Sequence, residues 1–392
     1  MVNEKLLALG KHRSKIRELF EYGKTISASG KPVCDLTLGN PTAKTPDWVT
    51  EALKRGIELE GIHAYTSAQG SQKAREVIAK LINENHQTLF SQNGIIITCG
   101  AAASLCGVIK ALVEKDTDEI AVLTPYFPEY KVFIESAGAR LITVPFTSDD
   151  FSPDVKSLER LITENTKALI INNPNNPSGK VYSKEEIEKI ARVLTAKQEA
   201  YGHPIYVISD EPYREIIFEN ETLPQIADLY KNTIICYSYS KSLSLPGERI
   251  GYIAIPNEIC LFNDLYAGFL GALRSVGYVC APSLFQYMIE NSKPIYSDFS
   301  VYENNKQILV KGLSEIGFIC NNPKGAFYLM VKAPDGDSEK MSELAKELGL
   351  LIVPGDSFGA KGYVRLATCV SQETAIDSVE LFRALAKSYN LL

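Results

Sequence analysis

The strongest constraint on the fold is an alternation between residues 45 and 285, where short apolar runs are separated by stretches with helical periodicity. The runs are rich in isoleucine and valine, as in strands buried on both faces. They occupy residues 95–99, 120–124, 141–146, 168–171, 205–209, 233–237 and 250–255. Helical patterns cover 101–114 and 183–198, and Ser183 with Glu186 forms a capping box at the start of the second. The alternation predicts an α/β domain with a mostly parallel, seven-stranded sheet between helices.

A different pattern follows residue 285 and predicts a smaller α+β domain. A long helical stretch at 286–313 comes first, followed by strand-like segments and helical segments in turn. The strand-like segments are 325–331, 351–354 and 363–368, and the helical ones are 338–348 and the end of the chain from residue 372. The first 44 residues are too short for a domain, so we expect them to pack on the small one. The expected division is therefore 1–44, 45–285 and 286–392.

Composition excludes several classes of protein. The chain has 392 residues, of which 45% are hydrophobic, and a net charge of -6, which argues against a general nucleic-acid binder. Eight cysteines without a CxxC pair predict reduced structural thiols and no metal site. Residues 1–20 lack the apolar core of a signal peptide, and Arg274 and Pro282 interrupt the apolar stretch 265–285. We therefore expect a cytoplasmic protein without a membrane span.

The end of the apolar run 233–237 carries the most telling residue, Lys241. Ser238 and Ser240 precede it and Arg249 follows. A lone lysine is usually solvated, but a buried strand here delivers the amine to a place where water is scarce. Burial and a nearby cation lower the pKa of a lysine, and a neutral amine attacks carbonyls to form imines. Because serine hydroxyls and a guanidinium suit a phosphate, the combination suggests pyridoxal phosphate.

Other predicted strand ends carry polar or aromatic groups, each with an ordinary structural alternative. Ala101 and Ala102 open a helix, where small residues either admit an anion or allow tight packing. Tyr126, between prolines, either stacks on a flat ligand or caps the core. The asparagine-rich segment 172–179 either makes a turn or a hydrogen-bonding site. Asp210 needs a cationic partner, which is either a protein group or a protonated pyridine nitrogen.

These groups together point to one site, because ligands of parallel sheets bind beyond the carboxyl ends of the strands. The segment from Ser238 to Arg249 resembles the lysine-attachment signature of the class I/II aminotransferases, fold-type I pyridoxal-phosphate enzymes related to aspartate aminotransferase. Residues 173–179 are similar to the Asn-Pro loop of that family, and Asp210 with Tyr213 matches its Asp-x-x-Tyr pair. The resemblance covers nearly the whole chain and implies the aspartate aminotransferase-like fold.

The resemblance implies a role for each of these residues towards the cofactor. Lys241 would anchor it and move protons, and Asp210 would hold its pyridinium nitrogen. Asn176 and Tyr213 would contact its phenolic oxygen, and Tyr126 would stack on its ring.

By the same resemblance, a second group of residues would cradle the phosphate. The backbone amides of Ala101 and Ala102 would bind it, and the side chains of Ser238, Ser240 and Arg249 would complete the cradle.

Three further residues outside these loops match positions of the family pattern. Gly39 lies in a segment similar to the entry loop, and Arg365 matches the arginine that binds the α-carboxylate, with a structural ion pair as its alternative. Tyr65 matches a tyrosine that reaches the phosphate of the partner subunit, which implies a homodimer with shared active sites.

Two departures from the family pattern bear on the substrate. Many aspartate-specific relatives carry a lysine at the position of Ala102, and Arg274 is out of register with the arginine that binds a second carboxylate. Both argue against specificity for aspartate.

We therefore expect an aminotransferase that moves an amino group between an L-amino acid and a 2-oxo acid by a ping-pong mechanism. A carbon–sulfur β-lyase on the same fold is the alternative, because both reactions begin with removal of the α-proton. A ligand sensor fused to a DNA-binding module is disfavoured, since about 40 residues precede the large domain and the chain is acidic.

Overall fold

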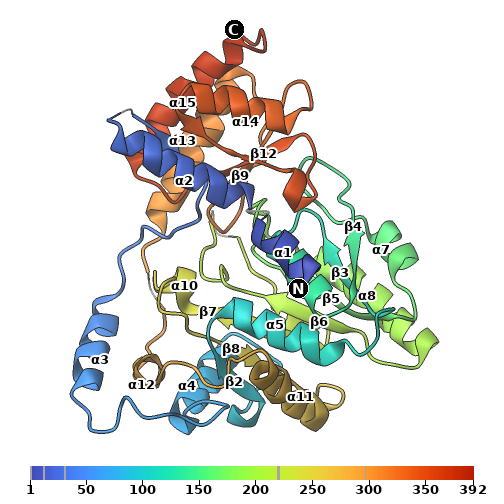
Figure 1. Ribbon diagram of the computed structural model, residues 1–392. Helices are drawn as coiled ribbons and strands as arrows, with labels where there is room; N and C mark the ends of the chain where they lie inside the picture. The colour runs from blue at the N-terminus through green and yellow to red at the C-terminus, as the bar shows by residue number, and fades with distance from the viewer. Residues whose placement is uncertain (1, 12–13, 31, 219–220, 296) are drawn as a thin grey trace.

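A seven-stranded sheet forms the centre of the large domain in the computed structural model, which describes residues 2–11, 14–30, 32–218, 221–295 and 297–392 (Figure 1). Its strand order is β2-β8-β7-β6-β5-β3-β4. The strands are β2 (Ile95–Thr98), β3 (Glu119–Leu123), β4 (Arg140–Val144), β5 (Thr166–Asn172), β6 (Tyr206–Asp210), β7 (Thr233–Ser238) and β8 (Gly251–Ala254). The seven apolar runs thus form the predicted sheet, in which β8 runs opposite to the other six strands.

The register of this sheet brings polar residues from distant parts of the chain to one edge. Asn172 at the end of β5 pairs with Asp210 at the end of β6, and Asp210 pairs with Cys236 of β7. Ser238 at the end of β7 pairs with Gly251 at the start of β8. Because β8 runs the other way, the chain enters β8 at the edge where β5, β6 and β7 end. This places Lys241 and Arg249 beside the same edge.

Helices cover both faces of the sheet, as the alternation of side chains requires. Ile96 faces the core under α5, α6 and α11, whereas Ile95 and Ile97 face the core under α3, α4 and α12. Each buried isoleucine contributes roughly 1.5–3 kcal/mol through burial. The large-domain helices are α3 (Asp47–Ile57), α4 (Gln72–Asn83), η1 (Gln92–Gly94), α5 (Ala101–Leu112), α6 (Glu129–Ser136), α7 (Val155–Leu161), α8 (Lys184–Tyr201), α9 (Ile226–Leu229), α10 (Tyr239–Ser242), α11 (Phe262–Ser275) and α12 (Ser283–Glu290). The predicted capping box of Ser183 and Glu186 is present at the start of α8.

A smaller sheet with order β11-β12-β9 and three helices form the upper body in Figure 1. Its elements are α13 (Ser300–Ile316), β9 (Tyr328–Lys332), α14 (Ser338–Glu347), β10 (Leu350–Leu351), β11 (Val353–Pro354), η2 (Asp356–Phe358), β12 (Tyr363–Ala367) and α15 (Gln372–Lys387). The long helix expected at 286–313 is wrong, since α12 ends at Glu290 and α13 begins only at Ser300. Pro294 explains the break, because proline lacks an N–H and restricts the residue before it.

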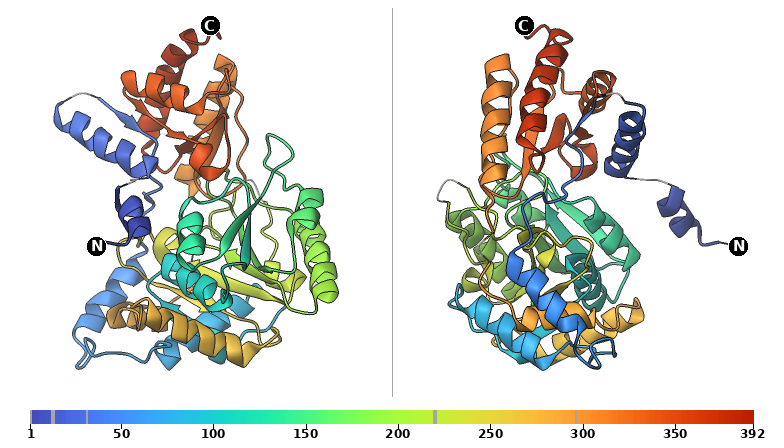
Figure 2. Two further views of the ribbon diagram at one scale, coloured as in Figure 1. Left: turned by 45° about the vertical axis from the view of Figure 1, so that its right-hand side comes forward. Right: turned by 90° about the vertical axis from the view of Figure 1, so that its left-hand side faces the viewer.

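The N-terminal segment contributes α1 (Glu4–Lys11), α2 (Lys15–Ala28) and β1 (Cys34–Asp35). β1 pairs in parallel with β10, and Leu19 of α2 is buried against Val353 and Phe358. α1 has no buried residue and lies away from the rest of the chain in the right-hand view of Figure 2. The division at residues 44 and 285 stays a prediction. Across the described ranges, no helix is both long and apolar enough to cross a membrane.

Candidate active site

Lys241 lies in the short helix α10, directly beyond the end of β7. The Ser238 hydroxyl caps this helix by accepting a hydrogen bond from the Ser240 backbone N–H at 3.3 Å. The Nζ of Lys241 donates to the carbonyl oxygen of Gly39 at 2.7 Å. Burial lowers the pKa of Lys241 to about 8, and the positive charges of Arg249 and Arg365 also lower it. A substantial fraction of this amine is therefore neutral near physiological pH, as a nucleophile requires.

A buried polar network supports the helix that carries Lys241. The Tyr237 hydroxyl lies 2.7 Å from the Ser242 hydroxyl and donates to Glu215 at 2.7 Å. Arg214 donates to Glu215 at 3.0 Å, and its guanidinium lies 3.9 Å from the Tyr237 ring centroid. These contacts hold Ser242, the residue after Lys241, in place.

Asp210 ends β6 and offers one carboxylate oxygen to a ligand. Tyr130 donates to its Oδ2 at 2.5 Å, and Asn172 donates to its backbone carbonyl at 2.9 Å. Its Oδ1 is buried and has no hydrogen-bond partner among the described residues. Burial, together with the neighbouring charge of Glu211, raises the pKa of Asp210 to about 7, although the hydrogen bond from Tyr130 lowers it. An unpaired buried carboxylate oxygen is costly, so this atom fits a cationic group supplied by a ligand.

The segment 172–179 folds into a loop that holds Asn176 over this edge. The backbone N–H of Asn176 donates to the Asn172 side chain at 2.6 Å. The Oδ1 of Asn176 accepts from the Nη1 of Arg365 at 3.2 Å. Asn175 accepts from both the backbone N–H and the hydroxyl of Ser178, which closes the loop on itself. Asn176 thus links the large domain to β12.

The start of α5 and Arg249 form a cradle for an anion. Gly100 precedes the helix with φ +87°, and a Cβ there would lie 2.8 Å from the Arg249 guanidinium. Arg249 donates to the Ser240 hydroxyl at 3.5 Å. The backbone N–H groups of Ala101 and Ala102 are at the positive end of the helix dipole, which favours a negative ligand.

Arg365 lies on β12 with its side chain buried. Its guanidinium is 4.6 Å from the Tyr328 ring centroid and 4.9 Å from that of Phe358. The Nη2 donates to the Thr37 carbonyl, and the Nε has no hydrogen-bond partner among the described residues. Burial lowers the pKa of Arg365. A buried guanidinium with an unpaired donor fits a carboxylate ligand.

Tyr213 and Gly39 both lie against Tyr328, the residue whose ring packs on the Arg365 guanidinium. The Tyr213 hydroxyl lies 3.1 Å from that of Tyr328, and burial raises the pKa of Tyr213 well above its usual range. A Cβ on Gly39 would overlap the Tyr328 hydroxyl, so the close approach of this loop requires glycine. The structure thus brings most of the predicted site residues together at one edge of the sheet.

Two predicted residues lie differently from the others. Tyr126 is buried in the core, and its backbone N–H donates to Phe358 at 2.9 Å. The next residue, Phe127, is only half-buried and packs edge-on against Tyr130 at 5.7 Å between ring centroids. Phe127 is therefore a second candidate for the stacking ring beside Tyr126. Tyr65 lies between α3 and α4 with 98% of its surface exposed.

Sequence reasoning assigned no role to Tyr130, Phe127 or Tyr328. It included Asn172 only as the first residue of the asparagine-rich segment 172–179, without a role of its own. Tyr130 and Tyr328 reach the site through contacts across 80 and 115 positions of the chain, to Asp210 and Tyr213. Local pattern carries no information on such pairs.

Comparison with known proteins decides the family. The family model described as aminotransferase class I and II matches residues 31–379. The aspartate aminotransferase of Pyrococcus horikoshii is 31% identical over 376 residues, covering 94% of this chain and 93% of the relative. This chain belongs to the class I and II aminotransferases.

Solved structures of other aminotransferases have the same fold. An amino transferase from Eubacterium rectale is 46% identical with a TM-score of 0.97, covering 100% of this chain and 99% of the other. Aspartate aminotransferase from Thermus thermophilus with maleate is 26% identical with a TM-score of 0.88, covering 98% and 99%. The predicted fold type and the aminotransferase activity on amino acids and oxo acids are confirmed.

The cofactor of this aminotransferase is pyridoxal phosphate, as its family requires. The chain's own residues fit that group. Lys241 supplies an amine with a lowered pKa, Asp210 presents an unpaired buried oxygen, and Gly100 leaves room beside Arg249. These three features match an aldehyde, a pyridinium nitrogen and a phosphate.

Proposed function

We propose that Lys241 is the residue that holds pyridoxal phosphate and transfers the proton in each half-reaction. When bound, the cofactor withdraws the electron pair that remains on the substrate α-carbon after proton removal. The Nζ of Lys241 removes the α-proton as a general base and returns a proton as a general acid. Its lowered pKa supports this role, because the pKa of an efficient base lies close to the working pH.

Asp210 keeps the cofactor nitrogen protonated in this proposal. Its free Oδ1 accepts from the nitrogen, while Tyr130 and Asn172 hold the rest of the residue. A positive charge on that nitrogen would favour the ionised carboxylate of Asp210, whose pKa burial otherwise raises to about 7. Asn176 and Tyr213 would contact the phenolic oxygen. Ala101, Ala102, Ser238, Ser240 and Arg249 would bind the phosphate.

Arg365 binds the α-carboxylate that amino acids and 2-oxo acids share. Its planar fork and unpaired Nε support a two-point contact, and Asn176 holds the guanidinium from the large-domain side. Gly39 brings the entry loop close to Tyr328, and its carbonyl oxygen accepts from the Nζ of Lys241. The single observation that carries the assignment is one site that combines a buried lysine, an unpaired buried carboxylate oxygen and an unpaired guanidinium donor.

For the side chain of the substrate, we infer a preference for amino acids without a second carboxylate. The methyl group of Ala102 offers no charge to such a group, and Arg274 is exposed at the end of α11. This differs from the aspartate named for several relatives.

The test is a single-turnover panel of amino acids. The holoenzyme is mixed with L-aspartate, L-glutamate, L-alanine or L-phenylalanine, and the absorbance of the lysine-bound cofactor is followed. We expect loss of that absorbance with the preferred amino acid and its return when a 2-oxo acid is added. The Lys241→Ala variant should retain cofactor without covalent attachment and lose about 10⁴-fold in kcat. Turnover by this variant at the wild-type rate contradicts the assignment.

The same proposal includes a homodimer in which Tyr65 completes the site of the partner subunit. Exposed apolar side chains lie on two segments, Ile57, Leu59 and Tyr65 on one and Tyr278 and Val279 on the other. Ser283, which follows the second segment, bonds to the carbonyl of Ile62 in the first. An apolar surface of this kind supports pairing with a second copy.

Subunit mixing tests the shared site. Lys241→Ala and Tyr65→Ala proteins are each expected to have low activity. If Tyr65 acts in the partner's site, a hybrid of the two variants has one site with both changes and one site with neither. Each hybrid dimer should then have up to half of the activity of a wild-type dimer. No gain on mixing, with exchange verified by mass, contradicts sharing.

We also infer that the enzyme works in the cytoplasm. All eight cysteines are free thiols, which supports a reducing compartment. Separating cell fractions and assaying the activity in each tests this location.

A further inference from the structure

A hairpin of residues 146–153 follows β4 and reaches from the large domain to the small one. Phe146 and Pro153 form an antiparallel bridge at its base, and the Thr147 N–H donates to the Ser152 carbonyl at 2.8 Å. Near its tip, Phe151 has φ +62°, a backbone conformation that residues other than glycine rarely adopt. Phe151 is nevertheless completely buried, so packing holds the tip in this conformation.

One side of the hairpin contacts the small domain. Asp149 accepts from the Nζ of Lys332 at 3.1 and 3.2 Å and from the Tyr363 hydroxyl. These bonds lower the pKa of the Asp149 carboxyl, the one from Tyr363 most. Phe151 packs with Met330, Ala360 and Tyr363 in a small separate cluster. The ring centroids of Phe151 and Tyr363 are 5.3 Å apart.

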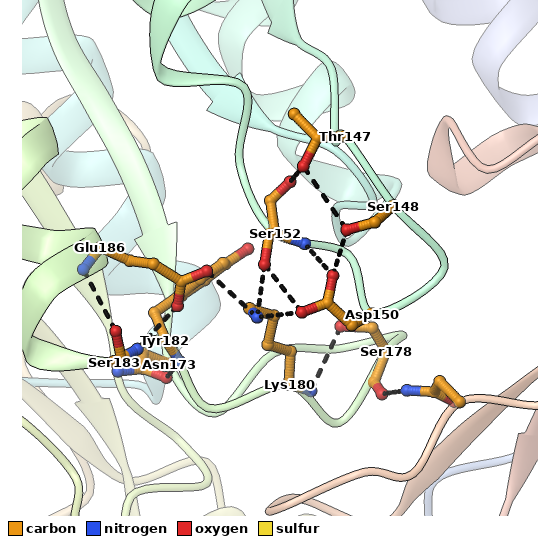
Figure 3. Close-up of polar contacts among 11 residues, drawn as sticks. Thr147, Ser148, Asp150, Ser152, Asn173, Ser178, Lys180, Tyr182, Ser183 and Glu186 are labelled. Atoms are coloured by element: carbon orange, nitrogen blue, oxygen red, sulfur yellow. Dashed lines mark hydrogen bonds and ion pairs between the residues drawn. The ribbon is translucent and has the colours of Figure 1, made fainter.

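The other side contacts the end of the asparagine-rich loop, as Figure 3 shows. The Nζ of Lys180 lies 3.2 Å from Asp150, 3.0 Å from the Ser152 hydroxyl and 3.1 Å from Glu186. Burial alone would raise the pKa of Asp150, but hydrogen bonds from Ser148 and Ser152 with the charge of Lys180 hold it well below its usual range. Adjacent aspartates therefore fasten the hairpin to different domains.

The contacts on both sides of the hairpin involve residues next to Arg365 or next to its partner Asn176. Met330 is the cross-strand partner of Arg365, and Tyr363 is two positions before it on β12. Side chains two positions apart, and those of cross-strand partners, share a face of the sheet. Phe151 and Asp149 thus support the face that carries Arg365. The carbonyl oxygen of Lys180 accepts a hydrogen bond from the backbone N–H of Asn175. The next residue, Asn176, accepts a hydrogen bond from Arg365.

We propose that the 146–153 hairpin is a brace that sets the position of Arg365 over Asn176, so that Asp149 and Phe151 are positioning residues for the substrate α-carboxylate. The proposal rests on the proposed carboxylate role of Arg365. Neither residue touches the cofactor cradle. Their effect is expected on the affinity for any ligand with an α-carboxylate, since a small misplacement of a binding group costs much of its contribution.

The test uses the holoenzyme and steady-state kinetics with the best amino acid and oxo acid from the panel above. In Asp149→Ala we expect KM to rise about 5-fold for both substrates with little change in kcat, because the ion pair is half-exposed, with side chains 42% and 51% exposed. In Phe151→Ala the rise should be on the order of 10-fold or more. Equal factors for the two substrates identify the shared carboxylate as the affected group. Cofactor affinity, measured by equilibrium dialysis, should not change.

Asp335→Asn is the matched control. It removes an aspartate that pairs with Lys340 at 2.8 Å inside the small domain, and we expect wild-type KM values. If Phe151→Ala does not fold, Phe151→Leu and Tyr363→Phe replace it.

Three outcomes overturn the brace. The first is an unchanged KM in folded Asp149 and Phe151 variants, whatever their melting temperature. The second is a rise for one substrate only, and the third is an equal rise in Asp335→Asn. Arg365→Ala is measured beside them. An unchanged KM in Arg365→Ala refutes the carboxylate role itself, whereas a raised KM there with unchanged brace variants refutes only the brace.

Discussion

The two halves of the active site are built by different means. The large-domain half, with Lys241 and Asp210, stands on the ends of β6 and β7, buried strands joined in register. The small-domain half, with Arg365, stands on β12 of a three-stranded sheet. It reaches the first half through Asn176 and the 146–153 hairpin.

The two halves therefore serve different steps, the proton transfer in one and the binding of the substrate carboxylate in the other. Backbone hydrogen bonds of the sheet hold Asp210 and the end of β7, directly before the helix that carries Lys241. Side-chain contacts between the domains hold Arg365 against Asn176. Damage to the first half is therefore expected in kcat, and damage to the second in KM.

Asp210→Asn should give the largest effect after loss of Lys241. The neutral amide leaves the cofactor nitrogen without its charged partner, and we expect kcat to fall about 10³-fold, as for a buried pair that loses one member. KM for the amino acid should change little. A KM effect larger than the kcat effect contradicts the division between the two halves. Asp210→Glu serves as the control that keeps the charge.

Arg365→Ala should act in the opposite way. Loss of a charged, two-point contact is expected to raise KM for both the amino acid and the oxo acid, lowering kcat/KM about 100-fold. Absorbance of the lysine-bound cofactor should remain as in wild type, because the cradle at α5 is intact. Arg365→Lys keeps the charge without the fork and should fall in between. A lost cofactor signal in Arg365→Ala refutes the separation.

The same difference decides how much the sequence could predict. The strand ends of the large domain follow from periodicity and from one topological rule, so Lys241, Asp210 and the loop with Asn176 could be placed at one edge before any coordinates. Arg365 was found only through family resemblance. Its neighbours Tyr328 and Phe358, and the hairpin with Phe151, depend on contacts between segments far apart in the chain.

The helix expected at 286–313 failed for a related reason. Pro294 interrupts the helical pattern of 286–313, and the chain forms two helices, one on each side of it. Tyr65 is 98% exposed within one subunit, so the role proposed for it depends on a second subunit that one chain does not include.

Tyr130→Phe tests the large-domain half by a smaller change than Asp210→Asn. It removes the hydroxyl that donates to Asp210 and leaves the packing against Phe127. Loss of one hydrogen bond to a charged group should lower kcat by about 10-fold, with KM unchanged. The pKa of Asp210 should rise in this variant, because Tyr130 lowers it. Tyr182→Phe, a buried tyrosine of another cluster, is the control. Equal loss in both variants assigns the effect to stability.

The smallest expected effect is a pH dependence of cofactor capture. Only the neutral amine of Lys241 attacks an aldehyde, and the folded pKa is lowered from 10.5 to about 8. In cofactor-free enzyme the capture rate should therefore rise roughly 10-fold from pH 7 and level off above pH 8 to 9. Nα-acetyl-lysine, measured in parallel, corrects for ionisations of the cofactor itself. A rate that still climbs at pH 10 means that burial does not lower the pKa of Lys241. Because Arg365 lowers that pKa in part, Arg365→Ala should move the midpoint upward. The size of that shift would measure how strongly Arg365, in the small-domain half, changes the pKa of Lys241 in the large-domain half.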